Sequence, residues 1–276
     1  MPQAERAAPY GNYKGYYTKR GNQTSDPRLK VLPSNLFKGK HVLDIGCNEG
    51  WVTCEIASCY GAQEVTGVDI DAELVSRAWR RRRDVWSLQP PRVPLRAPVD
   101  TLEEEDPNQP ENGAYFPECF SSLFGPVPIP SQHPAFPNNV SFHQCDWTNQ
   151  GCAMDEQGYN LVVAFSVSKW IHVHGGDEGI KRFFLRVRDV LAICATQASP
   201  GIFVLEAQPW SGYRSAMRKA NLHRPQEQKP LESLKLNPSD FSGILSELGF
   251  SEPRCAGIIG EGGFKRPIEI YELRLG

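Results

Sequence analysis

Short apolar segments alternate along this chain with segments whose apolar residues recur at helical spacing. One apolar segment begins at His41 and ends in a glycine-bounded turn, and the next segment, 51–60, has apolar side chains at 52, 56 and 57 on one helical face. Such alternation is typical of an α/β fold with a doubly wound, mostly parallel sheet. Further strands are predicted at 64–68, 140–145, 161–165 and 202–205, strand-like segments around 258 and at 268–273, and helices at 72–86, 177–191 and 238–248.

The pattern breaks between residues 89 and 138, which are rich in proline, acidic and polar residues and show no sustained periodicity. A segment of this composition buries too little apolar surface to offset the entropy lost on ordering. We therefore predict a disordered insert at 89–138 in an α/β domain that spans 41–276, preceded by an N-terminal arm at 1–40. The polar and basic segment 211–229 is predicted to be a connection between elements.

The turn after the first strand indicates a ligand site. Its glycines, Gly46 and Gly50, stand four residues apart, whereas a dinucleotide pyrophosphate requires the run G-x-G-x-x-G. S-adenosylmethionine (AdoMet) carries no phosphate, so Asp44 can face its cationic part and Asp69, after the second strand, can accept both ribose hydroxyls. We interpret the turn as the AdoMet cradle of a class I (Rossmann-like) methyltransferase, with S-adenosylhomocysteine as product. The alternative is a βαβ unit that binds no ligand.

Polar and aromatic residues also follow the next strands. Because the carboxyl ends of parallel strands line one crevice, Asp146, Trp147 and Phe165 should surround the same ligand as the turn. Asp146 would accept from the adenine amino group, while Ile70 and Trp147 would cover the ring. Taken alone, Asp146 and Trp147 could equally be a helix cap and a core residue.

Two clusters could bind a methyl acceptor. Lys169 and His172 follow the fourth predicted strand and suggest an anionic acceptor, although a solvent-facing lysine and a capping histidine would have the same pattern. Glu206, Gln208 and Trp210 follow the fifth strand, where they can hydrogen-bond to and stack on a nucleotide or support the neighbouring loop.

Basic segments favour RNA as a partner. Residues 10–20 combine four tyrosines with three cations, which suits base stacking and phosphate pairing on single-stranded RNA, or packing of the arm over the sheet. The cations of segment 211–229 could contact a nucleic-acid backbone or belong to a solvated loop. The run Arg80 to Arg83 is interpreted as a solvated helix end, ahead of RNA contact or a nuclear-import signal.

Bulk composition excludes several classes. The net charge of −2 gives no overall attraction to nucleic acid, so any contact must be local. The eight cysteines form no C-x-x-C pair, which favours free thiols in a reducing compartment and no metal site. No apolar run approaches the ~20 residues that cross a membrane, and the first residues do not resemble a signal peptide. A soluble intracellular protein is expected.

Motifs spread over nearly the whole chain form a set. They are Tyr-Gly-Asn-Tyr-Lys-Gly-Tyr-Tyr at 10–17, Leu-Asp-Ile-Gly-Cys-Asn at 43–48, Val-Asp-Ile-Asp at 68–71, Phe-Pro-Asn-Asn-Val at 136–140, Ser-Lys-Trp-Ile-His at 168–172, Gly-Asp-Glu-Gly at 176–179 and Glu-Ala-Gln-Pro-Trp at 206–210. Together they resemble the bicoid-interacting (methylphosphate capping enzyme) family of RNA methyltransferases. The resemblance implies a seven-stranded class I fold with an RNA-facing arm.

The resemblance also implies methylation of the 5′ γ-phosphate of a small non-coding RNA of the RNA polymerase III type, a nuclear location and a La-related RNA-binding protein as partner in a ribonucleoprotein. A second branch of the family methylates 5′ monophosphates, but the insert and the arm favour the triphosphate branch. A small-molecule or protein methyltransferase and a non-catalytic RNA-binding subunit stay open as alternatives.

The predicted site residues fall into three sets. The resemblance implies a catalytic role at the phosphate for Lys169, Tyr16 and Arg20. The resemblance implies AdoMet contacts for Tyr17, Arg28, Gly46, Cys47, Asn48, Asp69, Ile70, Asp146, Trp147 and Phe165, and the turn pattern adds Asp44. Contacts to the RNA end are predicted for Tyr13, His172, Glu206, Gln208, Pro209 and Trp210.

Overall fold

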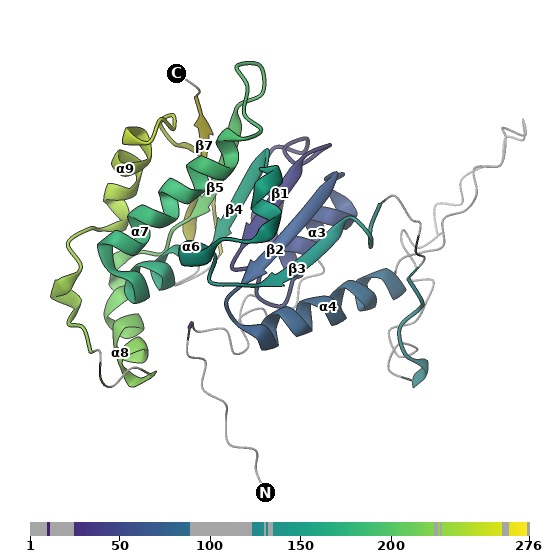
Figure 1. Ribbon diagram of the computed structural model, residues 1–276, viewed down its shortest axis with the longest axis horizontal. Helices are drawn as coiled ribbons and strands as arrows, with labels where there is room; N and C mark the ends of the chain where they lie inside the picture. Colours follow the sequence, from purple (N-terminus) through teal and green to yellow (C-terminus); the bar gives the residue numbers. More distant parts are fainter. Residues whose placement is uncertain are drawn as a thin grey trace, which may run out of the picture.

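A twisted sheet forms the centre of the molecule (Figure 1). The computed structural model describes residues 10–11, 25–88, 123–129, 131, 135–223, 226, 228–260 and 265–274. In that part of the chain seven strands pair in the order β3-β2-β1-β4-β5-β7-β6. The strands are β1 (His41–Ile45), β2 (Glu64–Asp69), β3 (Val140–Gln144), β4 (Leu161–Phe165), β5 (Gly201–Glu206), β6 (Arg254–Ile259) and β7 (Arg266–Leu273).

Strands β1 to β5 pair in parallel, whereas β7 is antiparallel to both β5 and β6. This arrangement confirms the predicted α/β fold with a doubly wound, mostly parallel, seven-stranded sheet. The strand order reverses between β1 and β4. The connections that follow these two strands therefore leave in opposite directions, and a crevice opens between them at the carboxyl ends of the strands.

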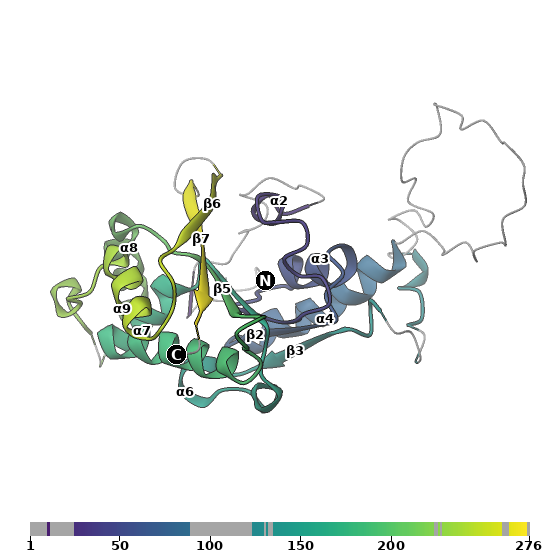
Figure 2. The same cartoon turned by 90° about the horizontal axis from the view of Figure 1, so that it is seen from above.

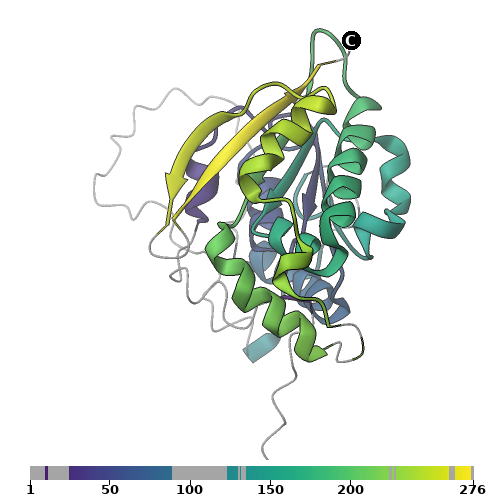
Figure 3. The same ribbon diagram turned by 90° about the vertical axis from the view of Figure 1, so that its left-hand side faces the viewer.

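Helices cover both faces of the sheet (Figure 2). Helix α8 packs on α7 and lies at the lower end of the molecule in Figure 3. One face carries α2 (Pro27–Lys30), α3 (Trp51–Cys59) and α4 (Ala72–Ser87). The other face carries α6 (Trp147–Gln150), α7 (Ser168–Ala192) and α9 (Phe241–Glu247). Helix α8 spans Tyr213–His223, and short 3-10 turns lie at Ala153–Gln157, Trp210–Gly212, Leu231–Ser233 and Pro238–Asp240.

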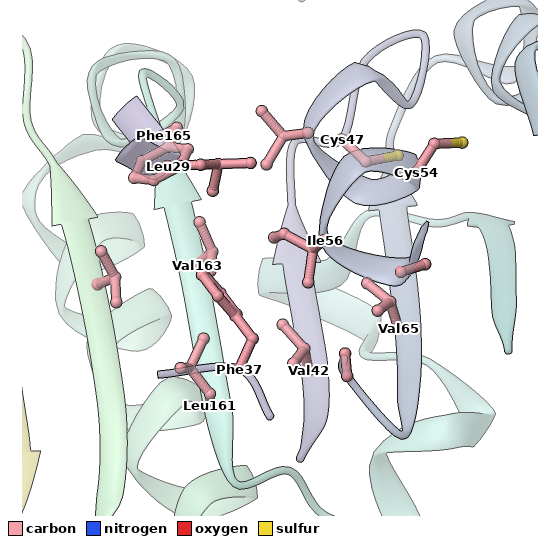
Figure 4. Packing of buried hydrophobic residues seen from close by; sticks show 14 of the residues in the cluster. Leu29, Phe37, Val42, Cys47, Cys54, Ile56, Val65, Leu161, Val163 and Phe165 are labelled. Carbon is pink, nitrogen blue, oxygen red and sulfur yellow. The ribbon is translucent and has the colours of Figure 1, made fainter. Parts of the chain in front are cut away.

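The alternation of side chains along each strand produces a core on either face. In β4 every residue is buried; Leu161 and Val163 belong to the cluster under α2 and α3, and Val162 to the cluster under α7 and α9. Figure 4 shows the first cluster, in which Phe37 lies beside Leu161 and Leu29 lies beside Phe165 near the carboxyl end of β4. The chain before β1 therefore helps to close the core.

Two of the longer helices differ from the sequence-based prediction, and the four-residue helices α2 and α6 were not predicted. The segment 211–229 was expected to be a connection, but Tyr213–His223 is helical and buries Tyr213, Ala216, Met217 and Ala220. That spacing of three, four and seven residues is the helical repeat, and the intervening cations obscured it. Helix α7 begins at Ser168 instead of 177, and Gly176 (φ 70°) interrupts its helical backbone, so only the second half was predicted.

Parts of the predicted arm and insert fall within the described residues. Leu29 and Phe37 in the arm are fully buried, and Phe136 near the end of the insert is buried. Residues 89–122 lie outside the described part, so the domain division stays a prediction. Within the described residues, none of the helices is both long and apolar enough to span a membrane.

Candidate active site

A cavity of about 470 Å³ lies at the carboxyl ends of the central strands. Its volume falls in the range of about 300–1,000 Å³ that is usual for small-molecule sites. Most of the predicted site residues among the described part of the chain line it, as the topology required. They are Arg28, Asp44, Gly46, Cys47, Asn48, Asp69, Ile70, Asp146, Trp147, Phe165, Lys169 and Gln208.

The glycine turn forms one wall of the cavity. Gly46 has φ 75°, and a Cβ there would lie 2.8 Å from the Val167 side chain, so the backbone approaches the opposite loop more closely than any other residue permits. The amides of Gly46 and Cys47 donate to the Val68 carbonyl at 2.9 and 3.0 Å, which ties the turn to the end of β2.

Two carboxyl groups give this end of the cavity an acidic character. Asp69 accepts from the backbone amides of Asn48 (2.9 Å) and Asp71 (3.0 Å), so its orientation is fixed. Burial raises its pKa to about 6, and the two amide donors oppose that rise. Asp44 is buried and accepts from the Thr53 hydroxyl at 2.6 Å; burial raises its pKa to about 6 as well.

Arg28 links the N-terminal segment to the sheet. Arg28 is 1% exposed; its guanidinium lies 4.6 Å from the ring centre of Phe165 and forms ion pairs with Asp26 (2.6 Å) and with Glu206 (3.1 Å). Glu206 also accepts from the Ser166 hydroxyl at 2.7 Å. This network holds the segment before β1 against the ends of β4 and β5. It also keeps Arg28 at the cavity, which Arg28 helps to line.

Cations occupy another part of the cavity wall. Lys169 and Arg266 both line the cavity, and Arg266 donates to the Ser166 hydroxyl at 2.8 Å. Burial, helped by the positive charges of Arg266 and Lys219, lowers the pKa of Lys169 to about 8. The described residues provide no carboxylate that pairs with Lys169. Its charge is therefore available to an anion in the cavity.

Gln208 fixes the loop that presents Lys169. Its side-chain oxygen accepts from the Lys169 backbone amide at 3.1 Å, and its amide nitrogen donates to the Ser166 carbonyl. Gln208 is 3% exposed. It lines the cavity as predicted, yet its polar atoms are used to shape the loop rather than presented to a ligand.

Asp146 and Trp147 have the cap and core contacts that their pattern allowed, and both also line the cavity. Asp146 caps α6 by accepting from the backbone amide (3.3 Å) and side chain (2.7 Å) of Asn149, and both Asp146 and Trp147 line the cavity. The Trp147 indole donates to Asp155 at 3.1 Å and packs against Phe183 in the core. Contact with an adenine stays a prediction.

Some predicted substrate residues do not line the cavity. His172 is fully buried; one ring nitrogen lies 2.8 Å from Asp177 and the other 3.3 Å from the Tyr213 hydroxyl, so it joins α7 to α8 and is not exposed to a substrate. Glu206 is engaged by Arg28. Pro209 and Trp210 lie outside the cavity lining, and the Trp210 ring packs against that of Tyr213, tilted by 30°, with 4.6 Å between ring centres.

Tyr13, Tyr16, Tyr17 and Arg20 lie outside the described residues, so their predicted roles rest on the sequence alone.

The cavity also contains residues that sequence reasoning did not assign. Arg266 is the first residue of β7, and no local motif marks it, because only the antiparallel insertion of β7 beside β5 brings it to the crevice. Tyr10, Trp170 and His174 form a group of rings, with His174 6.3 Å from Tyr10 and 6.4 Å from Trp170 between ring centres. The spacing of Trp170 and His174 by four residues on a helix could have indicated that pair.

Comparison with known proteins agrees with this arrangement. A family model described as Bicoid-interacting protein 3 (Bin3) matches residues 159–273, and a general methyltransferase-domain model matches residues 42–104. The chain is 30% identical to the U6 snRNA methylphosphate capping enzyme Amus of Drosophila melanogaster, over 95% of this chain and 74% of that protein. The chain belongs to the Bin3 family.

Other Bin3-type relatives are longer. The human 7SK snRNA methylphosphate capping enzyme is 32% identical over 97% of this chain, and this chain spans 40% of that protein. Among solved structures, magnesium protoporphyrin IX methyltransferase from Synechocystis PCC 6803 with bound SAM aligns over 97% of this chain and 88% of its own, with a TM-score of 0.51 and 16% identity. That likeness shows that this Bin3-family chain has the class I methyltransferase fold.

Proposed function

We propose that this protein is an AdoMet-dependent RNA methyltransferase that methylates the 5′ γ-phosphate of a small non-coding RNA. One observation carries the proposal: a single cavity has carboxyl groups on the β1 and β2 side and cations on the α7 and β7 side. The carboxyl side suits a cationic methyl donor, and the other suits an anionic acceptor. The named activities of the Bin3 relatives support the same substrate class.

The residues at the acidic side fit AdoMet. Asp69 has both oxygens held by backbone amides, which leaves lone pairs directed outward for the two ribose hydroxyls. The left-handed turn at Gly46 lets a ligand lie against bare backbone. Asp44, kept in a buried position, would be stabilised in its charged form by a nearby cation. When bound, AdoMet supplies an electrophilic methyl group on a positively charged sulfur.

Other residues hold the phosphate that accepts the methyl group. A phosphate oxygen is already anionic at neutral pH, so the reaction needs no general base. Lys169 would neutralise the phosphate and hold one of its oxygens in line with the methyl group, while Arg266 supplies a second positive charge close by. Gln208 keeps the Lys169 backbone in place. Tyr16 and Arg20 in the arm are proposed to orient the same phosphate.

From the resemblance we also propose a nuclear location and association with a La-related RNA-binding protein in a ribonucleoprotein. Co-purification from nuclear extract with an antibody to this chain tests both.

Transfer of labelled methyl groups to one RNA that carries a 5′ triphosphate, a 5′ monophosphate or a 5′ hydroxyl tests the function. We expect transfer to the triphosphate form and none to the hydroxyl form. Preferential transfer to the monophosphate would place the protein in the other branch of the family. Binding of all three without transfer would identify a non-catalytic RNA-binding subunit, and equal transfer to the hydroxyl form would exclude the terminal phosphate as acceptor.

A further inference from the structure

Helix α8 presents a basic face that the function proposed above does not use. The helix contains Arg214, Arg218, Lys219 and His223 and no acidic residue. Its buried side is formed by Tyr213, Ala216, Met217 and Ala220, so the cations are confined to the outer side. Arg214 and Arg218 are exposed one helical turn apart, and the described residues provide no carboxylate partner for either.

The basic face begins beside the cation that lines the cavity. The turn Trp210–Gly212 leads directly into α8, and a Cβ at Gly212 would lie 3.2 Å from the Lys169 ammonium. Lys219, on the second turn of α8, is near enough for its charge to contribute to the lowered pKa of Lys169. The positive charge of the cavity therefore continues out along α8, which follows the turn Trp210–Gly212 directly.

The shape of this feature indicates what it binds. A terminal phosphate in the cavity would leave the rest of an RNA chain to exit past Lys169, and each following nucleotide carries one further negative charge. Two exposed arginines one helical turn apart, for which the described residues provide no carboxylate partner, are suited to such a repeated charge and need no sequence information. By contrast, an isolated small anion would require only the cavity.

We propose that the outer face of α8, chiefly Arg214 and Arg218, binds the phosphates of the nucleotides that follow the methylated 5′ end. This inference rests on the proposed function. It makes α8 a determinant of affinity for long RNA, whereas the chemistry at the terminal phosphate belongs to the cavity.

The test is the double variant Arg214→Glu and Arg218→Glu, assayed on a 5′-triphosphate RNA of twenty nucleotides and on a 5′-triphosphate dinucleotide. We expect the KM for the long RNA to rise about tenfold, the KM for the dinucleotide to stay within twofold, and kcat to be unchanged on both. Losing two phosphate contacts should also reduce the salt dependence of long-RNA binding, with the slope of log K against log salt falling by about 1.4.

A matched control makes the same change in charge on another helix, α4. Arg80 and Arg83 are exposed on α4, at the lower right of Figure 1 and away from α8 at the lower left. The variant Arg80→Glu and Arg83→Glu should leave the KM for the long RNA within twofold. An equal loss in both double variants would mean that only the net charge matters, and would overturn the inference.

The remaining outcomes separate this inference from the proposed function. Equal increases in KM for the dinucleotide and for the long RNA would show that α8 acts on the terminal site and would overturn the inference. An unchanged KM for the long RNA would also overturn the inference. If the wild-type protein transfers no methyl group, fluorescence anisotropy of the long RNA still tests the inference. A loss of RNA affinity confined to the α8 variant would then uphold the inference while the proposed function fails. Absence of RNA binding, or binding that the α8 variant retains in full, overturns it.

Discussion

Replacing Lys169 by Met removes the positive charge that faces the cavity and keeps most of the side chain. The aliphatic stem can still pack beside Trp170, whose ring centre lies 5.2 Å from the ammonium. The backbone amide that Gln208 fixes is untouched. The change therefore tests the charge itself and leaves the shape of the loop intact.

The size of the effect follows from the surroundings of Lys169. A phosphate at about 4 Å from an ammonium gains about 4 kcal/mol at the effective dielectric constant of a site near a protein surface. Lys169 is only partly buried, so solvent and salt screen the pair, and we take about half of that value. A loss of about 2 kcal/mol corresponds to roughly a thirtyfold decrease in kcat/KM for RNA.

The assay is methyl transfer to 5′-triphosphate RNA with the RNA concentration varied, together with calorimetric titration of S-adenosylhomocysteine. We expect kcat/KM for RNA to fall about thirtyfold and the Kd of S-adenosylhomocysteine to change less than threefold. The control is Lys181→Met, because Lys181 lies on the same helix but is exposed and pairs with Glu178. A Lys169 variant within threefold of wild type would refute the electrostatic role of this residue.

Three further predictions follow from the same geometry. Since Lys169 is charged only below its pKa of about 8, kcat/KM for RNA should decline as pH rises through about 8, and Lys169→Arg should move that decline to higher pH. Asp69→Asn removes one charged acceptor and turns an NH2 group toward the backbone amide of Asn48 or of Asp71. Titration should therefore show at least about tenfold weaker binding of S-adenosylhomocysteine, with RNA binding unchanged. Glu206→Gln leaves the buried Arg28 with Asp26 as its remaining charged partner, and urea unfolding should show a loss of about 1.5–3 kcal/mol; a loss below about 0.5 kcal/mol would contradict the ion-pair assignment.

Residues that follow parallel strands could be predicted from the sequence because their position depends on local pattern. The apolar run 161–165 is β4 to the residue, and Asp69 and Asp146 stand where strand ends were expected. Once the strand order is fixed by the fold class, such residues must converge on one crevice. This is why most of the predicted cofactor residues line the cavity.

Residues whose role depends on packing between distant elements could not be predicted in this way. His172 has the pattern of a surface helix residue, and only the packing of α8 on α7 buries it against Tyr213. Glu206 looked like a ligand contact until Arg28, 178 positions earlier, formed its ion pair. Arg266 carries no motif and reaches the cavity through the antiparallel placement of β7.

The position of the transferred methyl group tests the central claim most directly. A 5′-triphosphate RNA would be incubated with the protein and isotopically labelled AdoMet, digested to nucleotides and analysed by mass spectrometry. The account predicts label on the terminal phosphate of the 5′ nucleotide alone, released when that phosphate is removed. Label on a base or on a ribose hydroxyl would contradict it, because the cations that face the cavity would then have no anionic acceptor to hold.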